Sequence, residues 1–151
     1  MLFLIYFVAQ GYKMREINFK KIDEIIDTFY FNLSLKQNDI VKVIENIPEI
    51  YSESTFLYKK ILSKITSLSK EKDLLKLAIF NKQKSNPIRV YTKTEIEDYF
   101  VSGDKKIIKL SKKIEKYEGY IMRLDQLFNL LNNMSFITKS FIKIQEKRGK
   151  I

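Results

Sequence analysis

The chain has 151 residues, contains no cysteine and no histidine, and carries a formal net charge of +10. This composition excludes zinc fingers, thiol nucleophiles, imidazole bases and disulfides, and it suits a reducing cytoplasm. The 4 glycines never bracket a Walker-type phosphate loop, and no paired carboxylates stand out on one expected helix face. We therefore expect a non-enzymatic protein of one domain, or one core plus an extended arm, with no catalytic residue, metal site or cofactor.

The first 13 residues are an apolar extension that contains the run LFLIYFVA. A membrane-spanning helix needs about 20 apolar residues, and neither a preceding basic residue nor a cleavage site supports a signal peptide. Met14 opens a more ordinary start, so one interpretation is a start codon assigned too early. A strand, an oligomer contact and a short anchor are the alternatives. We expect no stable membrane insertion.

Residues 14–46 are expected to form an N-terminal helical arm, because apolar side chains recur at roughly helical spacing from Ile17 to Phe29. Residues 32–38 are polar and turn-like. Asn46 and Pro48 are typical of a helix start, with asparagine as the N-cap and proline in the first turn. A long helix is therefore expected from about residue 49 to residue 82.

Residues 47–93 are expected to form a basic helix and turn that bind nucleic acid. Within this region, residues 59–93 hold 10 basic and 2 acidic side chains, which indicates a polyanionic partner; a solvated lysine-rich surface is the alternative. Only 4 of the 28 basic residues are arginine, which favours phosphate contacts over base-edge recognition. Tyr91 and Phe80 are candidates for base stacking, although Phe80 borders the apolar stripe of this long helix. That stripe consists of Leu57, Ile61, Ile65, Leu68, Leu75 and Ile79. The candidate nucleic-acid-binding residues are Lys72, Lys76, Lys82, Lys84 and Arg89.

Residues 94–151 are expected to form a C-terminal helical oligomerisation region. Thr92 and Glu95 form a capping box before a short acidic helix, and Asp104 precedes the final helix. The final helix carries an unbroken 3-4-3-4 apolar stripe, which is typical of a coiled coil. The stripe consists of Ile107, Leu110, Ile114, Tyr117, Ile121, Leu124, Phe128 and Leu131. The sequence thus predicts an all-α fold of two long helices with a C-terminal coiled-coil segment.

A second apolar stripe, offset by one residue, runs from Leu127 to Ile144. One residue corresponds to about 100° of helix rotation, so the helix either meets a different neighbour or breaks near Asn132 and Asn133. The first interpretation favours an assembly above a dimer, because two stripes need two partners. A helical hairpin that buries both stripes inside one chain is the alternative.

Three stretches occur in an order that is informative: IPEIYSESTFLYKKILSKITSLSKEKDLLKL (47–77), KTEIEDYFVSGDKKIIKLSKKIEKYEGYI (93–121) and LNNMSFITKSFIKIQEKR (131–148). Together they resemble the UvsY-type recombination mediators of large tailed phages, over roughly residues 14–148. Three features depart from the family, and one of them is the short loop after the first long helix. Met134-Ser135 stands where many members carry an Arg-Gly pair, and only Lys84 matches the Lys-x-Arg pattern that a member uses for single-stranded DNA.

The resemblance implies a phage-encoded accessory protein of the host cell cytoplasm. Such mediators form ring-like homo-oligomers above a dimer and bind single-stranded DNA. They help a RecA-type recombinase to displace the single-strand-binding protein. Two alternatives remain open from the residues alone: a structural coiled-coil adaptor without nucleic-acid activity, and a basic protein of the membrane surface.

Overall fold

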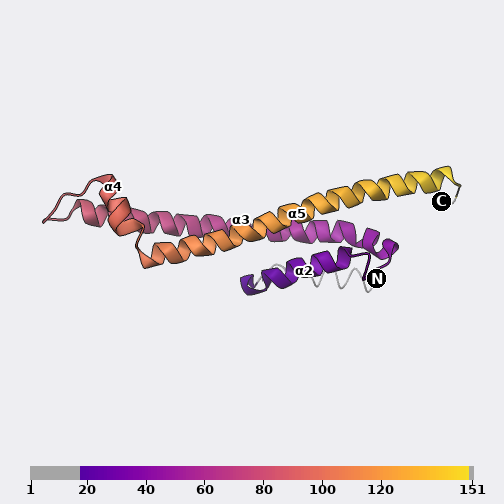
Figure 1. The fold of residues 1–151 in the computed structure, drawn as a ribbon, viewed down its shortest axis with the longest axis horizontal. Helices are drawn as coiled ribbons and strands as arrows, with labels where there is room; N and C mark the ends of the chain where they lie inside the picture. The colour runs from indigo at the N-terminus through magenta and orange to yellow at the C-terminus, as the bar shows by residue number, and fades with distance from the viewer. Residues whose placement is uncertain (1–17, 150–151) are drawn as a thin grey trace. The chain divides into compact units, whose positions relative to one another are not determined.

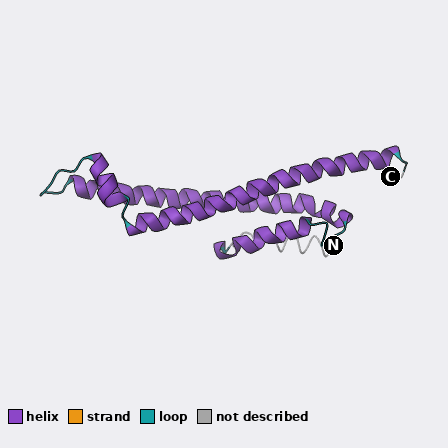
Figure 2. Ribbon diagram, in the orientation of Figure 1, coloured by secondary structure: helices purple, strands orange, loops and turns teal. Residues whose placement is uncertain are grey.

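The structure is a computed structural model that describes residues 18–149. In this part of the chain every regular element is a helix (Figure 1, Figure 2). The prediction of an all-α fold with two long helices is confirmed, whereas the extension at residues 1–13 and Met14 lie outside the described residues. The elements are the 3-10 helix η1 (Phe19–Lys21), α2 (Ile22–Leu33), α3 (Ile40–Lys84), α4 (Lys93–Ile96), the π-helix η2 (Glu97–Val101) and α5 (Lys105–Lys147).

Two compact units make up the chain. Among the described residues, the first contains residues 18–60 and 120–149, and the second contains residues 61–119. Because α3 and α5 both continue across these divisions, each unit contains a segment of both long helices. The predicted regions 14–46, 47–93 and 94–151 follow the order of the sequence, whereas the first unit joins segments that lie far apart in it. Within residues 18–149, no helix combines the length and the apolarity that a transmembrane span requires.

The second long helix begins earlier than predicted. Asp39 caps α3, because its carboxylate accepts a hydrogen bond from the Lys42 backbone N–H at 2.8 Å. Asn46 is buried and is not a cap; its side-chain amide donates to the Asn32 carbonyl oxygen at 3.0 Å. Pro48 lies inside α3 and is exposed, so the helix continues past it with one backbone hydrogen bond fewer. The predicted start at Asn46 and Pro48 is wrong because Asn46 makes a tertiary contact instead.

The core of the first unit is formed by α2 and by segments of α3 and α5. The α2 spacing places four apolar side chains on one face, and burying each contributes about 1.5–3 kcal/mol. The Phe128 ring of α5 meets the rings of Tyr51 and Tyr58 of α3 edge-on, with centroids 5.8 and 5.6 Å apart. The buried apolar residues include Ile22, Ile26, Phe29 and Leu33 of α2, Val43, Ile47, Ile50 and Leu57 of α3, and Leu124, Leu127 and Leu131 of α5.

The second unit has a small core of its own. The buried side chains of Ile96, Val101 and Ile107 form its centre. Four partly buried residues pack against them: Leu75, Ile79, Phe80 and Tyr91. This core joins α4 and η2 to the second half of α3 and to the start of α5.

The final helix, α5, runs without a break from Lys105 to Lys147, so it does not end near Asn132 and Asn133. Its first stripe is largely covered within the chain itself, which agrees with the hairpin alternative for that stripe. Beyond Leu131, none of the residues up to 149 is buried, so the second stripe lies uncovered there. In the first stripe, the buried members are Ile107, Leu110, Tyr117, Leu124 and Leu131, and the half-buried members are Ile114, Ile121 and Phe128.

Candidate nucleic-acid interface

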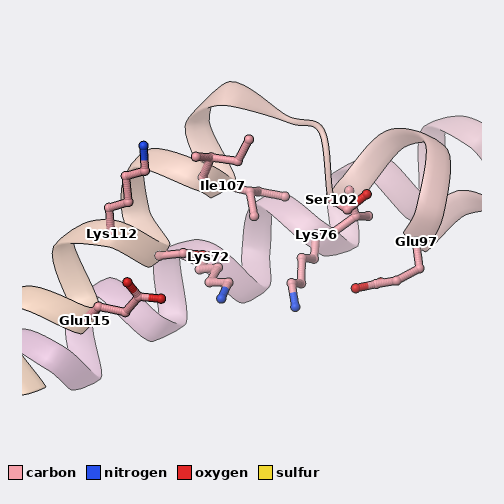
Figure 3. Close-up of a pocket in the computed structure, with 10 residues that line it drawn as sticks. Lys72, Lys76, Glu97, Ser102, Ile107, Lys112 and Glu115 are labelled. Atoms are coloured by element: carbon pink, nitrogen blue, oxygen red, sulfur yellow. The ribbon is translucent and has the colours of Figure 1, made fainter.

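A groove of about 380 Å³ opens in the second unit (Figure 3). It lies between α3, η2 and the first turns of α5, and we call it the lysine groove. Three lysines and two glutamates provide its charge. The lining residues are Lys72 and Lys76 of α3, Glu97, Val101 and Ser102 of η2 and the turn after it, and Ile107, Ile108, Ser111, Lys112 and Glu115 of α5.

Lys72 interrupts the apolar stripe of α3 at the groove. Leu68 and Leu75 stand on either side of Lys72 at the 4-residue and 3-residue spacing of one helix face. A lysine at such a position packs its methylene stem against apolar neighbours and directs its amine toward water. Lys72 is accordingly half-buried, and the space beside it is not filled by an apolar side chain.

The π-helix η2 supplies the third side of the groove. The preceding α4 starts with the predicted capping box: the Glu95 backbone N–H donates to the Thr92 hydroxyl at 3.2 Å, and the Thr92 N–H donates to the Glu95 carboxylate at 2.8 Å. The Ser102 backbone N–H then donates to the Glu97 carbonyl oxygen at 3.0 Å, which closes the wider π-type turn. π-Helical turns often occur at functional sites.

The lysines of the groove have no ionic partner among the described residues. The ion pairs in that part of the chain involve Arg89 and Arg123, and none includes Lys72, Lys76 or Lys112. Lys72 and Lys76 are half-buried, whereas Lys112 is exposed. Figure 3 shows the amine of Lys112 directed away from the amines of Lys72 and Lys76. Unpaired amines on two sides of one groove are available to an anionic ligand.

The other predicted lysines lie at the end of α3. Lys82 and Lys84 are exposed in its last turn, outside the groove but within the same unit. Positive side chains near a helix C-terminus are stabilised by the helix dipole, so their position also has a structural explanation. The structure thus brings Lys72 and Lys76 together and leaves Lys82 and Lys84 on an exposed helix end.

The side chain of Arg89 is engaged within the protein. Its guanidinium lies 5.0 Å from the centroid of the Tyr91 ring and 3.5 Å from the Glu95 carboxylate. The Tyr91 ring also meets the Phe100 ring edge-on at 5.1 Å. Phe80 packs against the core of the second unit, in keeping with its position beside the apolar stripe. Arg89 thus covers one face of the Tyr91 ring, and both Tyr91 and Phe80 are partly buried against this core.

Sequence reasoning missed the part of the groove that α5 contributes. None of Lys112, Glu97 and Glu115 was singled out from the sequence. The lysine at position 72 was the signal that would have located the groove, because it breaks an otherwise apolar stripe. To identify its neighbours on α5, one must know which residues of α3 and α5 lie opposite each other, and the sequence alone does not give this.

Within residues 18–149, no three acidic side chains gather as a metal site would require. Comparison of the chain with protein-family models, with curated proteins and with solved structures finds no match.

Proposed function

We propose that this protein is a recombination mediator. In this proposal it binds single-stranded DNA as a homo-oligomer and helps a RecA-type recombinase displace the single-strand-binding protein, in the cytoplasm of a phage-infected cell. The observation that carries the proposal is the set of unpaired lysines in the groove, Lys72, Lys76 and Lys112. The exposed Lys82 and Lys84 extend the basic surface along α3.

The charge of the second unit supports phosphate binding. Residues 61–119 hold 14 basic and 8 acidic side chains, and 13 of the basic side chains are lysines. Lysine is a compact cation that contacts phosphate without reading base edges. Binding should therefore weaken with salt, with a log–log slope of about −0.7 for each phosphate that is neutralised on a single strand.

The uncovered end of α5 supports self-association. Five large apolar side chains on this segment are 41% to 71% exposed, and we call them the C-terminal apolar face. A second copy of the chain would remove this surface from water, at about 25 cal/mol for each Å² of apolar area. An oligomer would also present several lysine grooves to one strand, so that weak contacts add through effective concentration. The face is centred on Ile137, Phe141 and Ile144, and Phe136 and Ile142 flank it on either side.

A loading assay tests the mediator function. Single-stranded DNA is first covered with single-strand-binding protein, a RecA-type recombinase is added, and the lag before DNA-dependent ATP hydrolysis is measured. We expect the protein to shorten the lag. The double variant Lys72→Gln/Lys76→Gln should lose most of this effect. The matched variant Lys59→Gln/Lys70→Gln, which removes two exposed lysines of the same helix outside the groove, should retain it.

A lag that the wild-type protein leaves unchanged, at concentrations that saturate the DNA, would contradict the mediator function. The structural coiled-coil adaptor is the second candidate, and the C-terminal apolar face favours it. An adaptor is expected to form oligomers and to show no affinity for single-stranded DNA even at low salt.

A further inference from the structure

Two carboxylates stand among the lysines of the groove. Glu97 belongs to η2 and Glu115 to α5, and neither makes an ion pair among the residues that the structure describes. These carboxylates would lower the affinity of the groove for a ligand that consisted of phosphate alone, since carboxylate and phosphate repel each other. Carboxylates accept hydrogen bonds from N–H donors. A ligand that uses all of these groups must carry both negative charge and hydrogen-bond donors.

The lysines lie on two sides of the groove. Lys72 and Lys76 extend from α3, and Lys112 extends from α5 in a different direction (Figure 3). A small anion with a single charge centre would contact one side only. A strand that crosses the groove places successive phosphates at both sides and one nucleoside between them.

The remaining lining consists of three apolar residues and two serines, Ser102 and Ser111. Val101 and Ile107 are buried beneath the groove, and Ile108 is partly exposed at 39%. Apolar side chains of this kind cover the face of a sugar or a base. The volume of about 380 Å³ lies within the range of about 300–1,000 Å³ that is usual for small ligands, so a single nucleotide unit is of suitable size.

We propose that the lysine groove holds one nucleotide of the bound single strand. Its flanking phosphates contact Lys72 and Lys76 on one side and Lys112 on the other, and the amino group of its base donates to Glu97 or Glu115. The groove therefore prefers bases that carry an exocyclic amino group over thymine. Cytosine offers its N4 amino group to a carboxylate, whereas thymine presents a carbonyl oxygen there, which repels one. This inference rests on the proposed binding of single-stranded DNA.

Two pyrimidine strands test the preference, because they differ only at the base. Labelled 15-nucleotide strands of dC and of dT are titrated with the full-length protein, and their dissociation constants are compared. We expect dC to bind at least about threefold more tightly. The variant Glu97→Gln/Glu115→Gln should reduce this ratio to near 1 and should also tighten the binding of dT, because two negative charges are removed. A merely structural role of the glutamates predicts no change in the ratio.

A matched lysine pair tests the second side of the groove. Lys112→Gln should weaken the binding of dC at least about threefold, whereas Lys113→Gln, which removes the neighbouring exposed lysine of α5 outside the groove, should weaken it less. Equal affinities of the wild-type protein for dC and dT would overturn this inference and leave the proposed function standing. Absence of binding to either strand at low salt would overturn the proposed function itself. A labelled glutamate-rich peptide is titrated with the wild-type protein and with Lys112→Gln as well. If Lys112→Gln loses the binding of this peptide but keeps the wild-type affinity for DNA, the groove holds an acidic peptide instead.

Discussion

At the scale of single residues, Arg123 joins α5 to α2 in the first unit. One guanidinium nitrogen donates to Asp23 at 2.7 Å and another to Asp27 at 2.8 Å. The Tyr120 hydroxyl donates to the same Asp23 carboxylate at 3.1 Å. The two aspartates lie four residues apart on one face of α2, so a forked cation can reach both. The network fixes the position of α5 against α2 beside the apolar core.

Replacing Arg123 should destabilise the protein measurably. Exposed ion pairs contribute about 0.2–1 kcal/mol each, so Arg123→Ala should lower the free energy of unfolding by about 1 kcal/mol in urea denaturation. Arg123→Lys keeps the charge and loses the fork, so it should recover only part of this loss. The same loss from Arg148→Ala, an exposed arginine at the end of the chain, would show that the network contributes nothing specific.

The pKa of Glu53 predicts a pH dependence. Burial, followed by the charge of Glu49, raises this pKa from 4.5 to about 7. The folded state therefore holds this proton more tightly than the unfolded chain between these two pH values. The stabilising effect of that difference is full below about pH 4.5 and is lost as the pH rises to about 7.

Glu53→Gln removes the titration. We expect it to flatten the fall in unfolding free energy between pH 5 and pH 8. At pH 8 it should raise that free energy by about 1 kcal/mol, a value that allows for solvent screening of a partly exposed group. Urea denaturation at both pH values measures this. Glu71→Gln, an exposed glutamate of the same helix, serves as the control; an identical response of both variants would contradict the assignment.

At the scale of elements, the sequence predicted the helix starts that are determined by neighbouring residues. The capping box at Thr92 is confirmed, and Asp104 accepts hydrogen bonds from the Lys106 and Ile107 backbone N–H groups at 2.9 and 3.0 Å at the start of α5. Apolar spacing gives the face of a helix but does not name the partner, which is why the α5 stripe suggested another chain. The groove was missed for the same reason, since it depends on which residues of α5 stand opposite Lys72.

Pro48 destabilises the helix α3, in which it lies. An interior proline costs a helix about 3 kcal/mol, partly offset by the smaller entropy of the unfolded chain. Because Pro48 lies exposed inside α3, Pro48→Ala should raise the free energy of unfolding by about 1–2 kcal/mol and should increase helicity by circular dichroism. A helix that started at Asn46 would place this proline in its first turn, where the same substitution would be neutral or destabilising.

At the scale of the whole molecule, the exposed end of α5 predicts self-association. Light scattering coupled to size-exclusion chromatography should show the wild-type protein above the mass of a dimer. Phe136→Ser/Phe141→Ser should lower that mass, because it removes two aromatic side chains from the C-terminal apolar face. Phe31→Ser, which changes a 54% exposed phenylalanine of α2, should leave the mass unchanged. The face is not the oligomer contact if the double variant keeps the wild-type mass.

The salt dependence of DNA binding is the most direct test of the proposed function, because the proposal rests on contacts between lysines and phosphates. Fluorescence anisotropy of a labelled single strand is measured against the purified protein over a series of salt concentrations, with a duplex of equal length alongside. Binding should favour the single strand and weaken steeply with salt, with a log–log slope of about −2 or steeper if three lysines contact phosphates. Absence of binding to the single strand at low salt would contradict the proposal and favour the structural adaptor.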